Sequence, residues 1–222
     1  MEQQHSSEDL KNIAKQLACP EGEHGIKTAE MMNASNAGMI HSAIVALDLE
    51  KGNILLEIGH GNGAHIENLL KQADDIRYFG ADISETMIAE AKKINAAFIE
   101  AGKVNFQLTN GYTLPYAAAS FDGIFTVNTI YFWQNPDTYL LEIKRVLKPG
   151  GKLVLCFADK IFMEKLPFTT YGFTLYDAET VTTMLKRAGF DQFKAHLKTE
   201  EISSNAGFMI TRDYHLISAT KS

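Results

Sequence analysis

The sequence contains little cysteine, and this scarcity excludes two ways of holding a small protein together. Its two cysteines, Cys19 and Cys156, lie far apart and outside any CxxC pair. Neither a disulfide framework nor a thiolate metal site is therefore expected, and a reducing, cytoplasmic location fits best. Residues 1–5 also lack the basic-then-apolar order of a signal peptide.

Long apolar runs and an excess of positive charge are missing as well. The apolar segments have the length of strands, well short of the roughly 18 to 20 residues that span a bilayer, so no membrane span is expected. The formal net charge is -6 and the isoelectric point about 5.6, which disfavours nucleic acid as a partner. The patterns GxxxxGK[ST], HExxH and GxSxG do not occur. Phosphate-loop enzymes, zinc hydrolases and nucleophile-elbow hydrolases thus lack support, and no metal is expected.

What is present is an alternation of strand and helix patterns in a chain of 222 residues, long enough for one α/β domain. Apolar and alternating runs predict strands at 54–58, 77–81, 104–108, 121–127, 152–157, 193–197 and 208–216. The last two strands follow each other without a helix between them, which indicates an antiparallel pair. We therefore expect a seven-stranded mixed sheet, its last strand antiparallel, with helices on both faces.

Helical spacing recurs between these strands and before the first one. Residues 1–50 are expected to form a helical preface to a main domain at 51–222, with the segment 31–36 joining two leading helices. Further helices are expected at 66–70, 84–98, 135–147 and 177–189.

The sharpest motif is a glycine loop where the first strand meets the first helix of the main domain. It reads Glu57-Ile58-Gly59-His60-Gly61-Asn62-Gly63. Glycines let the backbone approach a ligand closely, and the following helix presents free N–H groups to an anionic group. A tight strand-to-helix turn with no ligand is the alternative for these residues alone.

From residue 53 to 217 the chain resembles the class I S-adenosylmethionine-dependent methyltransferase family, a Rossmann-like fold. The resemblance rests on Glu57 before alternating glycines, on Asp82 after the second strand, and on the landmarks at 120–122, 128–133 and 147–151. It implies that Glu57, Gly59, His60 and Gly61 hold the methionine part of S-adenosylmethionine. The cofactor half is similar to the branch that includes ubiquinone and menaquinone C-methyltransferases.

The same resemblance implies further cofactor contacts. Asp82 would accept hydrogen bonds from the ribose hydroxyls, unless it only caps the next helix. Ile83 and Met87 would flank the adenine ring, or belong to the core. Asn110, where many relatives have an acid, would accept the adenine amino hydrogen beside Gly111, although an asparagine before glycine is also a turn signal. Backbone at Asn128 would meet the amino group of the cofactor.

For the small-molecule acceptor the sequence offers only candidates. Tyr131, Trp133, Phe168 and Tyr171 are the tentative contacts, the last two in an aromatic segment at 160–176 that could form a lid or a loop packed on the sheet edge. The segment 31–36 could close over the cofactor, or Ser35 and Asn36 could begin a helix. His60, His41, Tyr131 and Tyr171 are conceivable bases, but no second residue positions any of them, so no catalytic residue is assigned.

Two other functions remain open at this level. The loop Gly59 to Ala64 with Asp82 also satisfies the dinucleotide pattern of a NAD-dependent oxidoreductase. A non-catalytic ligand-binding module with the same fold is the other possibility. Glu57, the 147–151 landmark and the terminal strand pair favour methyl transfer from S-adenosylmethionine by direct displacement. Neither the acceptor nor the oligomeric state follows from the sequence.

Overall fold

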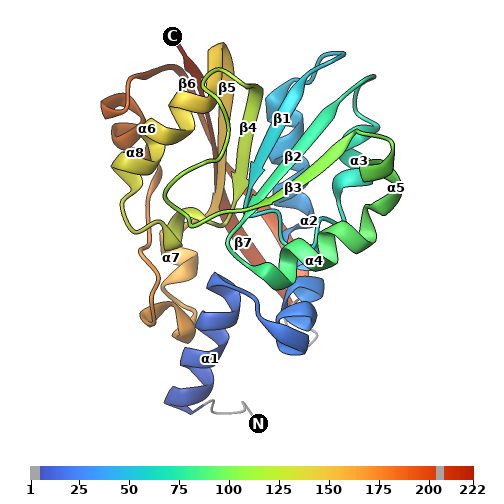
Figure 1. The fold of residues 1–222 in the computed structure, drawn as a ribbon. Helices are drawn as coiled ribbons and strands as arrows, with labels where there is room; N and C mark the ends of the chain where they lie inside the picture. Colours follow the sequence, from blue (N-terminus) through green and yellow to red (C-terminus); the bar gives the residue numbers. More distant parts are fainter. Residues whose placement is uncertain (1–5, 204–207) are drawn as a thin grey trace.

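The computed structural model describes residues 6–203 and 208–222, so the N-terminal pattern at 1–5 lies outside it. In the described part the strands form one sheet in the order β3-β2-β1-β4-β5-β7-β6 (Figure 1). The strands are β1 (Ile54–Ile58), β2 (Arg77–Asp82), β3 (Val104–Leu108), β4 (Phe121–Val127), β5 (Leu147–Ala158), β6 (Phe190–Ser203) and β7 (Met209–Lys221). β1 to β5 pair in parallel, whereas β7 is antiparallel to β5 and β6. The predicted mixed α/β sheet is confirmed.

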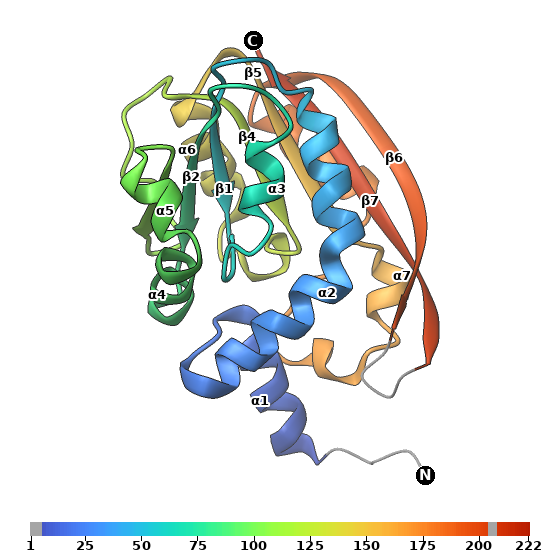
Figure 2. The same ribbon diagram turned by 90° about the vertical axis from the view of Figure 1, so that its right-hand side faces the viewer.

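Helices cover both faces of this sheet. They are α1 (Ser7–Ala18), α2 (Gly22–Leu47), α3 (Ile66–Leu70), α4 (Glu85–Ile94), α5 (Ala96–Glu100), α6 (Pro136–Val146), α7 (Lys160–Met163) and α8 (Ala178–Arg187), with short 3₁₀ turns η1 (Ile130–Phe132) and η2 (Pro167–Thr170). Figures 1 and 2 show α2 and α3 on one side of the sheet and α6 and α8 on the other. None of the helices described is both long and apolar enough to cross a membrane.

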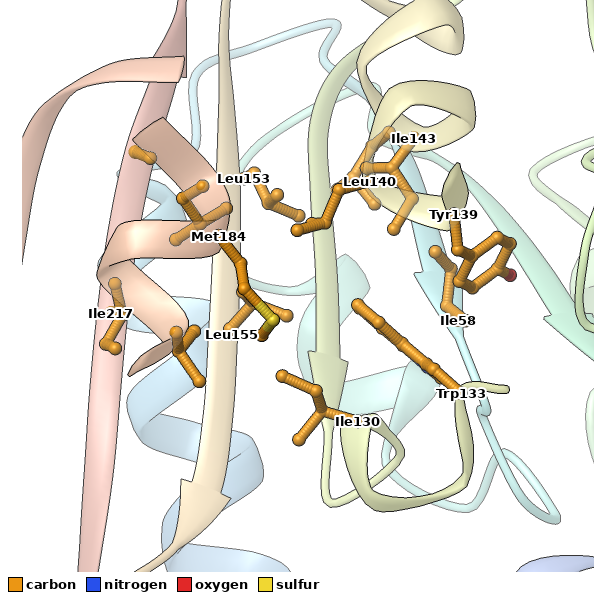
Figure 3. Close-up of a cluster of buried hydrophobic side chains, with 14 of the residues drawn as sticks. Ile58, Ile130, Trp133, Tyr139, Leu140, Ile143, Leu153, Leu155, Met184 and Ile217 are labelled. Carbon is orange, nitrogen blue, oxygen red and sulfur yellow. The ribbon is translucent and has the colours of Figure 1, made fainter. Parts of the chain in front are cut away.

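The alternation of side chains along each strand divides the core into two layers. On β5, Leu153 and Leu155 pack in the layer under α6 and α8, while Val154 and Cys156 pack in the layer under α2 and α3. Figure 3 shows the first layer, where Leu140 of α6 and Met184 of α8 approach the leucines of β5. This burial on both faces explains why the central strands are nearly continuously apolar.

The expectation of a linker at 31–36 is wrong, because α2 runs unbroken from Gly22 to Leu47. Ser35 donates a hydrogen bond to the Met32 carbonyl inside the helix. Asn33 and Asn36 bond instead to side chains of the main domain, Asn62 and Arg212. The polar residues in this segment therefore do not mark a helix start. The side chains of Asn33 and Asn36 attach α2 to the rest of the fold.

Other boundaries also differ from the prediction. The helix expected at 84–98 is divided at Asn95, whose side-chain amide donates to the carbonyls of Gly63 and Ala91. Leu147, expected in a helix, ends α6 and already belongs to β5. The antiparallel pair β6 and β7 is confirmed, but β6 extends beyond the predicted bounds at both ends and β7 extends to Lys221. Residues 198–203 of β6 are polar apart from Ile202, so no apolar pattern marks them as a strand.

A buried polar cluster holds the loop after β1 against the sheet. The Glu57 carboxylate, 2% exposed, accepts hydrogen bonds from the Tyr78 hydroxyl at 2.5 Å and from His65 Nε2 at 2.7 Å. Burial lowers the pKa of His65, but the charge and hydrogen bond of Glu57 outweigh this and raise it overall. For Tyr78, burial and the same carboxylate raise the pKa well above its usual value, so it stays a donor.

The layer under α6 yields a test of the packing. Leu140 is fully buried, whereas its neighbour Leu141 is 56% exposed on the same helix. Leu140→Ala should lower the free energy of unfolding by about 2–5 kcal/mol, since it leaves a cavity. Leu141→Ala should change it by less than about 0.5 kcal/mol. Urea unfolding of both variants measures the contrast, and equal losses would contradict the packing described.

The Glu57 cluster predicts a pH dependence. Because the pKa of His65 is raised on folding, its stabilising contribution is complete below the unfolded pKa of about 6.5 and is lost as pH rises through the folded pKa. The stability advantage of the wild type over His65→Gln should therefore be larger at about pH 6 than at about pH 9. Unfolding of both proteins across this range measures it, with the exposed His24→Gln as control. An advantage that grows with pH would refute the assignment.

Candidate functional site

Two glycines in left-handed conformations shape the loop that follows β1. Gly59, at φ +75°, donates its amide to the Ala81 carbonyl at 2.7 Å, and a Cβ there would collide with the methyl group of Thr129. Gly61, at φ +57°, has open space where a Cβ would stand. The first glycine thus lets the loop pass close to β4, and the second leaves bare backbone beside a cavity.

Asp82 closes the carboxyl end of β2 and is 7% exposed. One of its carboxylate oxygens accepts the Gly61 amide at 3.1 Å, and the other accepts the Ser84 amide at 2.9 Å. Ser84 itself caps α4 by accepting the Met87 amide. Asp82 is therefore not the cap of α4, and each carboxylate oxygen keeps a further lone pair for a ligand.

A cavity lies between these two loops at the carboxyl ends of the parallel strands. Its wall contains most of the predicted cofactor residues, namely Gly59, Gly61, Asp82, Ile83, Met87, Gly111 and Asn128. Glu57 and His60 line a smaller adjoining cavity that shares Gly59, Gly61 and Met87. Ile83 is 42% exposed, as a residue covering a flat ligand would be, and Met87 is fully buried.

Asn110 and His60 are placed differently from the other predicted residues. Asn110 lines neither cavity, and its side-chain oxygen accepts the amides of Tyr112 and Thr113 in a local turn. The His60 ring packs against Phe106 at 4.8 Å between centroids, and its Nδ1 lies 2.6 Å from the Gly61 carbonyl. Burial lowers the pKa of His60, which favours the neutral ring.

Asn128 stands between the cofactor-side cavity and a second one. It has φ +57°, unusual for a residue other than glycine, and its side chain is bonded at both ends. The oxygen accepts the Tyr131 hydroxyl and the Ala158 amide at 3.0 and 3.1 Å, and the nitrogen donates to Asn36. These bonds hold the strained backbone at the point where the two cavities meet.

The second cavity, of about 270 Å³, contains two of the four predicted acceptor contacts. Tyr131 and Phe168 line it, together with aromatic residues of the segment 160–176. Trp133 lies on the cofactor side, where its indole donates to Thr129 and packs on Tyr139. Tyr171 lines none of these cavities and bonds through its hydroxyl to Ser7 of α1. His41, on α2, is not among the lining residues of any of them either.

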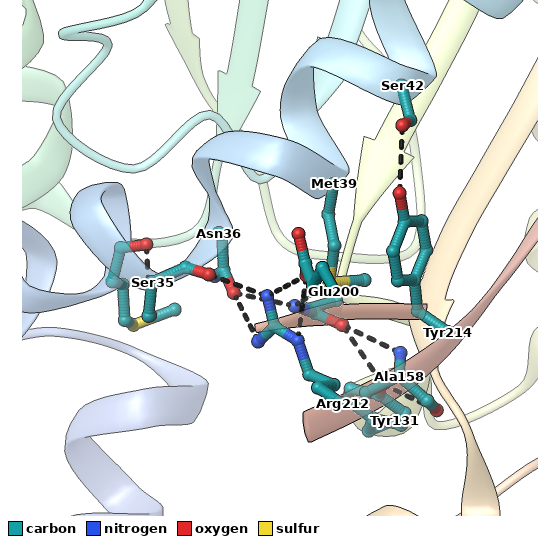
Figure 4. Close-up of polar contacts among 11 residues, drawn as sticks. Ser35, Asn36, Met39, Ser42, Tyr131, Ala158, Glu200, Arg212 and Tyr214 are labelled. Carbon is teal, nitrogen blue, oxygen red and sulfur yellow. Dashed lines mark hydrogen bonds and ion pairs between the residues drawn. The ribbon is translucent and has the colours of Figure 1, made fainter. Parts of the chain in front are cut away.

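Arg212 is the main site residue that the sequence reading missed. Its side chain, 6% exposed, lines the second cavity, and its guanidinium pairs with Glu200 on the adjacent strand at 2.6 Å. A signal was available, because Arg212 occupies the same register as Ile210, Tyr214 and Leu216 in the alternating pattern of β7. A charged residue in a buried register needs a partner, and Glu200 and Asn36 provide it here (Figure 4).

Among residues 6–203 and 208–222, no three histidine, cysteine or acidic side chains gather as metal ligands would. The described site is thus built from backbone amides, one carboxylate at the end of β2, and a polar cluster around Asn128. Such an arrangement can bind an adenosyl-type ligand at a sheet edge beside a second, largely apolar compartment.

Comparisons with known proteins agree with this geometry. Residues 56–155 match the model of a methyltransferase domain. An uncharacterized methyltransferase, YdaC of Bacillus subtilis, is 30% identical over 76% of this chain and 88% of its own length. The O-methyltransferase resE of Aspergillus sclerotiorum is 29% identical over 57% of this chain, and the match spans 47% of that protein.

A solved structure shares the fold across nearly the whole chain. The phosphoethanolamine N-methyltransferase 2 of Haemonchus contortus, in complex with phosphomonomethylethanolamine and S-adenosylhomocysteine, superposes with a TM-score of 0.71 over 96% of this chain and 60% of its own, at 14% identity. The strand order, the loops at Gly59 and Asp82, the domain match and the relative in Bacillus subtilis lead to one assignment. The chain belongs to the class I S-adenosylmethionine-dependent methyltransferase family.

Proposed function

We propose that this protein transfers the methyl group of S-adenosylmethionine to a small-molecule acceptor by direct displacement. The observation that carries the proposal is the pair of cavities that meet at Asn128, one beside the loops of β1 and β2 and the other lined by aromatic side chains. When bound, the sulfonium supplies a methyl group that is already activated. The protein then has to align two ligands and exclude water.

The residues on the cofactor side fit an adenosyl ligand. Asp82 is positioned to accept from ribose hydroxyls through the lone pairs that Gly61 and Ser84 leave open. Ile83, Met87 and Gly111 form the wall on which an adenine ring would lie. The bare backbone at Gly61, Glu57 behind it, and Asn128 would face the methionine part.

Two of the proposed cofactor residues take narrower roles. The Asn110 oxygen already accepts two amides, so we propose that its side-chain nitrogen or the neighbouring Gly111 backbone meets the adenine edge. For His60 we propose a contact through the backbone only, because its ring is packed against Phe106. A neutral, enclosed ring of this kind supports the loop rather than acting as a base.

On the acceptor side, we propose that α2 and the segment 160–176 cover the second cavity as two walls. Met32 and Asn36 of α2 line it together with Phe162 and Phe168 of that segment. Tyr131 is a wall residue and not a base, since burial raises the pKa of its hydroxyl far above the neutral range. Methylation of carbon in a quinol-type ring, as the similarity to ubiquinone and menaquinone C-methyltransferases implies, is compatible with this apolar lining but is not required by it.

The proposal predicts how the protein binds its cofactor. Asp82→Ala should weaken binding of S-adenosylmethionine and S-adenosylhomocysteine at least tenfold, because hydrogen bonds to a charged group contribute about 1.5–3 kcal/mol. Calorimetric titration measures this, with NAD(H) as a competing ligand that should not bind.

Asp122→Asn is the matched control for that titration, since Asp122 is a partly buried carboxylate at the other end of the sheet that bonds to Ile54 and Lys148. It should leave the affinity within about twofold. Binding of NAD(H) instead of the adenosyl ligands would favour an oxidoreductase, and binding of neither would favour a module that no longer uses a cofactor. Equal losses in both aspartate variants would show that Asp82 acts through folding alone.

A further inference from the structure

The polar end of the second cavity has a definite hydrogen-bonding character. Asn36 Oδ1 accepts from Asn128 and from Arg212 Nη1 at 3.2 and 3.0 Å. Asn128 Oδ1 likewise accepts twice, and the Ser35 carbonyl accepts Arg212 Nη2 at 2.6 Å. The amide and peptide oxygens at this end therefore already have donors.

Some N–H donors at this end of the cavity, by contrast, have no acceptor in the described part of the chain. A guanidinium carries five N–H groups, and Arg212 uses two on Glu200, one on Ser35 and one on Asn36. One Nη1–H is left, on the edge that faces away from Glu200. The side-chain nitrogen of Asn36 also makes no hydrogen bond to the residues that the structure describes. Unused donors next to satisfied acceptors call for an electron-rich ligand atom.

The rest of the cavity is apolar. Its wall includes Phe132, Phe162, Met163, Phe168, Phe173 and Ile210. Its volume of about 270 Å³ is just below the about 300–1,000 Å³ that is usual for ligand pockets, so the acceptor has to be compact. An ammonium acceptor would find no open amide oxygen at the polar end. A phosphate ester would bring more oxygens and more negative charge than the one open N–H of Arg212 and the Asn36 nitrogen can bind. Neither suits this compartment.

On these grounds, and resting on the proposed function, we infer that the acceptor is a compact apolar ring compound methylated on an anionic oxygen, which Arg212 and Asn36 hold at the Asn128 end of the cavity. The oxygen is a carboxylate or a phenolate and loses its proton to solvent before it binds. Its lone pair forms the new oxygen–carbon bond while the carbon–sulfur bond breaks, and the sulfur keeps that electron pair. An anion and a sulfonium thus become an ester or ether and a thioether, with no proton left to remove.

The charge balance of this step suits the cavity. Opposite charges attract more strongly in a low dielectric, and their combination into neutral products needs no solvent to reorganise. The titratable groups near the polar end also fit a reaction without a protein base. Tyr131 stays protonated through burial, and Glu200, paired with Arg212, is not among the residues that line the cavity.

The inference is tested on the full chain saturated with S-adenosylhomocysteine, so that cofactor binding is established first and separately. The probes share one bicyclic body: 2-naphthoate, 2-naphthol and 2-naphthylmethylamine, with phosphoethanolamine as a polar comparison. Calorimetry should show saturable binding of naphthoate or naphthol and at least tenfold weaker binding of the two amines. With S-adenosylmethionine, mass spectrometry should detect the methyl ester or the methyl ether, which identifies the oxygen used.

Arg212→Gln should weaken binding of the preferred acidic probe at least tenfold while leaving the affinity for S-adenosylhomocysteine within twofold. Arg212→Lys keeps the positive charge and should retain part of the binding of the acidic probe. It replaces Arg212→Gln in the test if the glutamine variant does not fold. Arg187→Gln is the matched control, because it removes an arginine paired with Asp137 on the exposed side of α8.

Three binding results in the wild-type protein would overturn the inference while leaving the proposed function intact. The cationic naphthyl probe could bind as tightly as the acidic ones, phosphoethanolamine could bind in their place, or the cofactor complex could bind none of the naphthyl compounds. A parallel loss of cofactor and probe binding in both Arg212 variants would also overturn it. Failure to bind S-adenosylhomocysteine at all would instead refute the proposed function.

Discussion

The geometry of the site depends on how the loop after β1 is fastened to the end of β2. The Gly59 amide bonds to the Ala81 carbonyl, and the Gly61 amide bonds to the Asp82 carboxylate. Both bonds require left-handed backbone that an L side chain adopts only with strain. Because parallel strands end at one edge, these two bonds bring a bare peptide backbone and a carboxylate to the same cavity.

Further hydrogen bonds hold the site from inside the protein and from the neighbouring strand β4. Glu57, next to the last residue of β1, accepts hydrogen bonds from Tyr78 and His65, so the end of β1 is tied to β2 and to the start of α3. On the other side, Asn128 continues the edge from β4 and bonds to α2 through Asn36. The helical preface is therefore attached to the sheet by polar contacts at the site as well as by the apolar layer beneath it.

The sequence predicted where the strands lie in the chain, and most of the residues that line the first cavity, because those features are local. The loop at Gly59, the acid at Asp82 and the buried strands each leave a signal within a few residues. The unbroken α2 and the role of Arg212 depend on partners 90 or more positions away, Asn128 for Asn36 and Asn36 for Arg212. Asn36 was interpreted as a possible helix start because helix-start signals depend only on neighbouring residues, whereas its partner Arg212 is distant in the sequence. Trp133 was proposed as an acceptor contact from its place after the fourth strand, and Tyr171 from its place in an aromatic segment. In the structure Trp133 bonds to Thr129 and Tyr171 bonds to Ser7.

A buried pair such as Arg212 and Glu200 is a poor source of stability, since removing both charges from water costs about as much as their attraction returns. Its position suggests why it is present. The pair joins β6 to β7 at the same point where Arg212 reaches Asn36 and the second cavity. An apolar replacement would pack there equally well, but it would leave Asn36 Oδ1 without one of its donors and remove the remaining N–H from the cavity. By binding the Nε and Nη2 edge of the guanidinium, Glu200 fixes the orientation of Nη1 beside Asn36 and the cavity. This orientation serves ligand recognition and is not needed for folding.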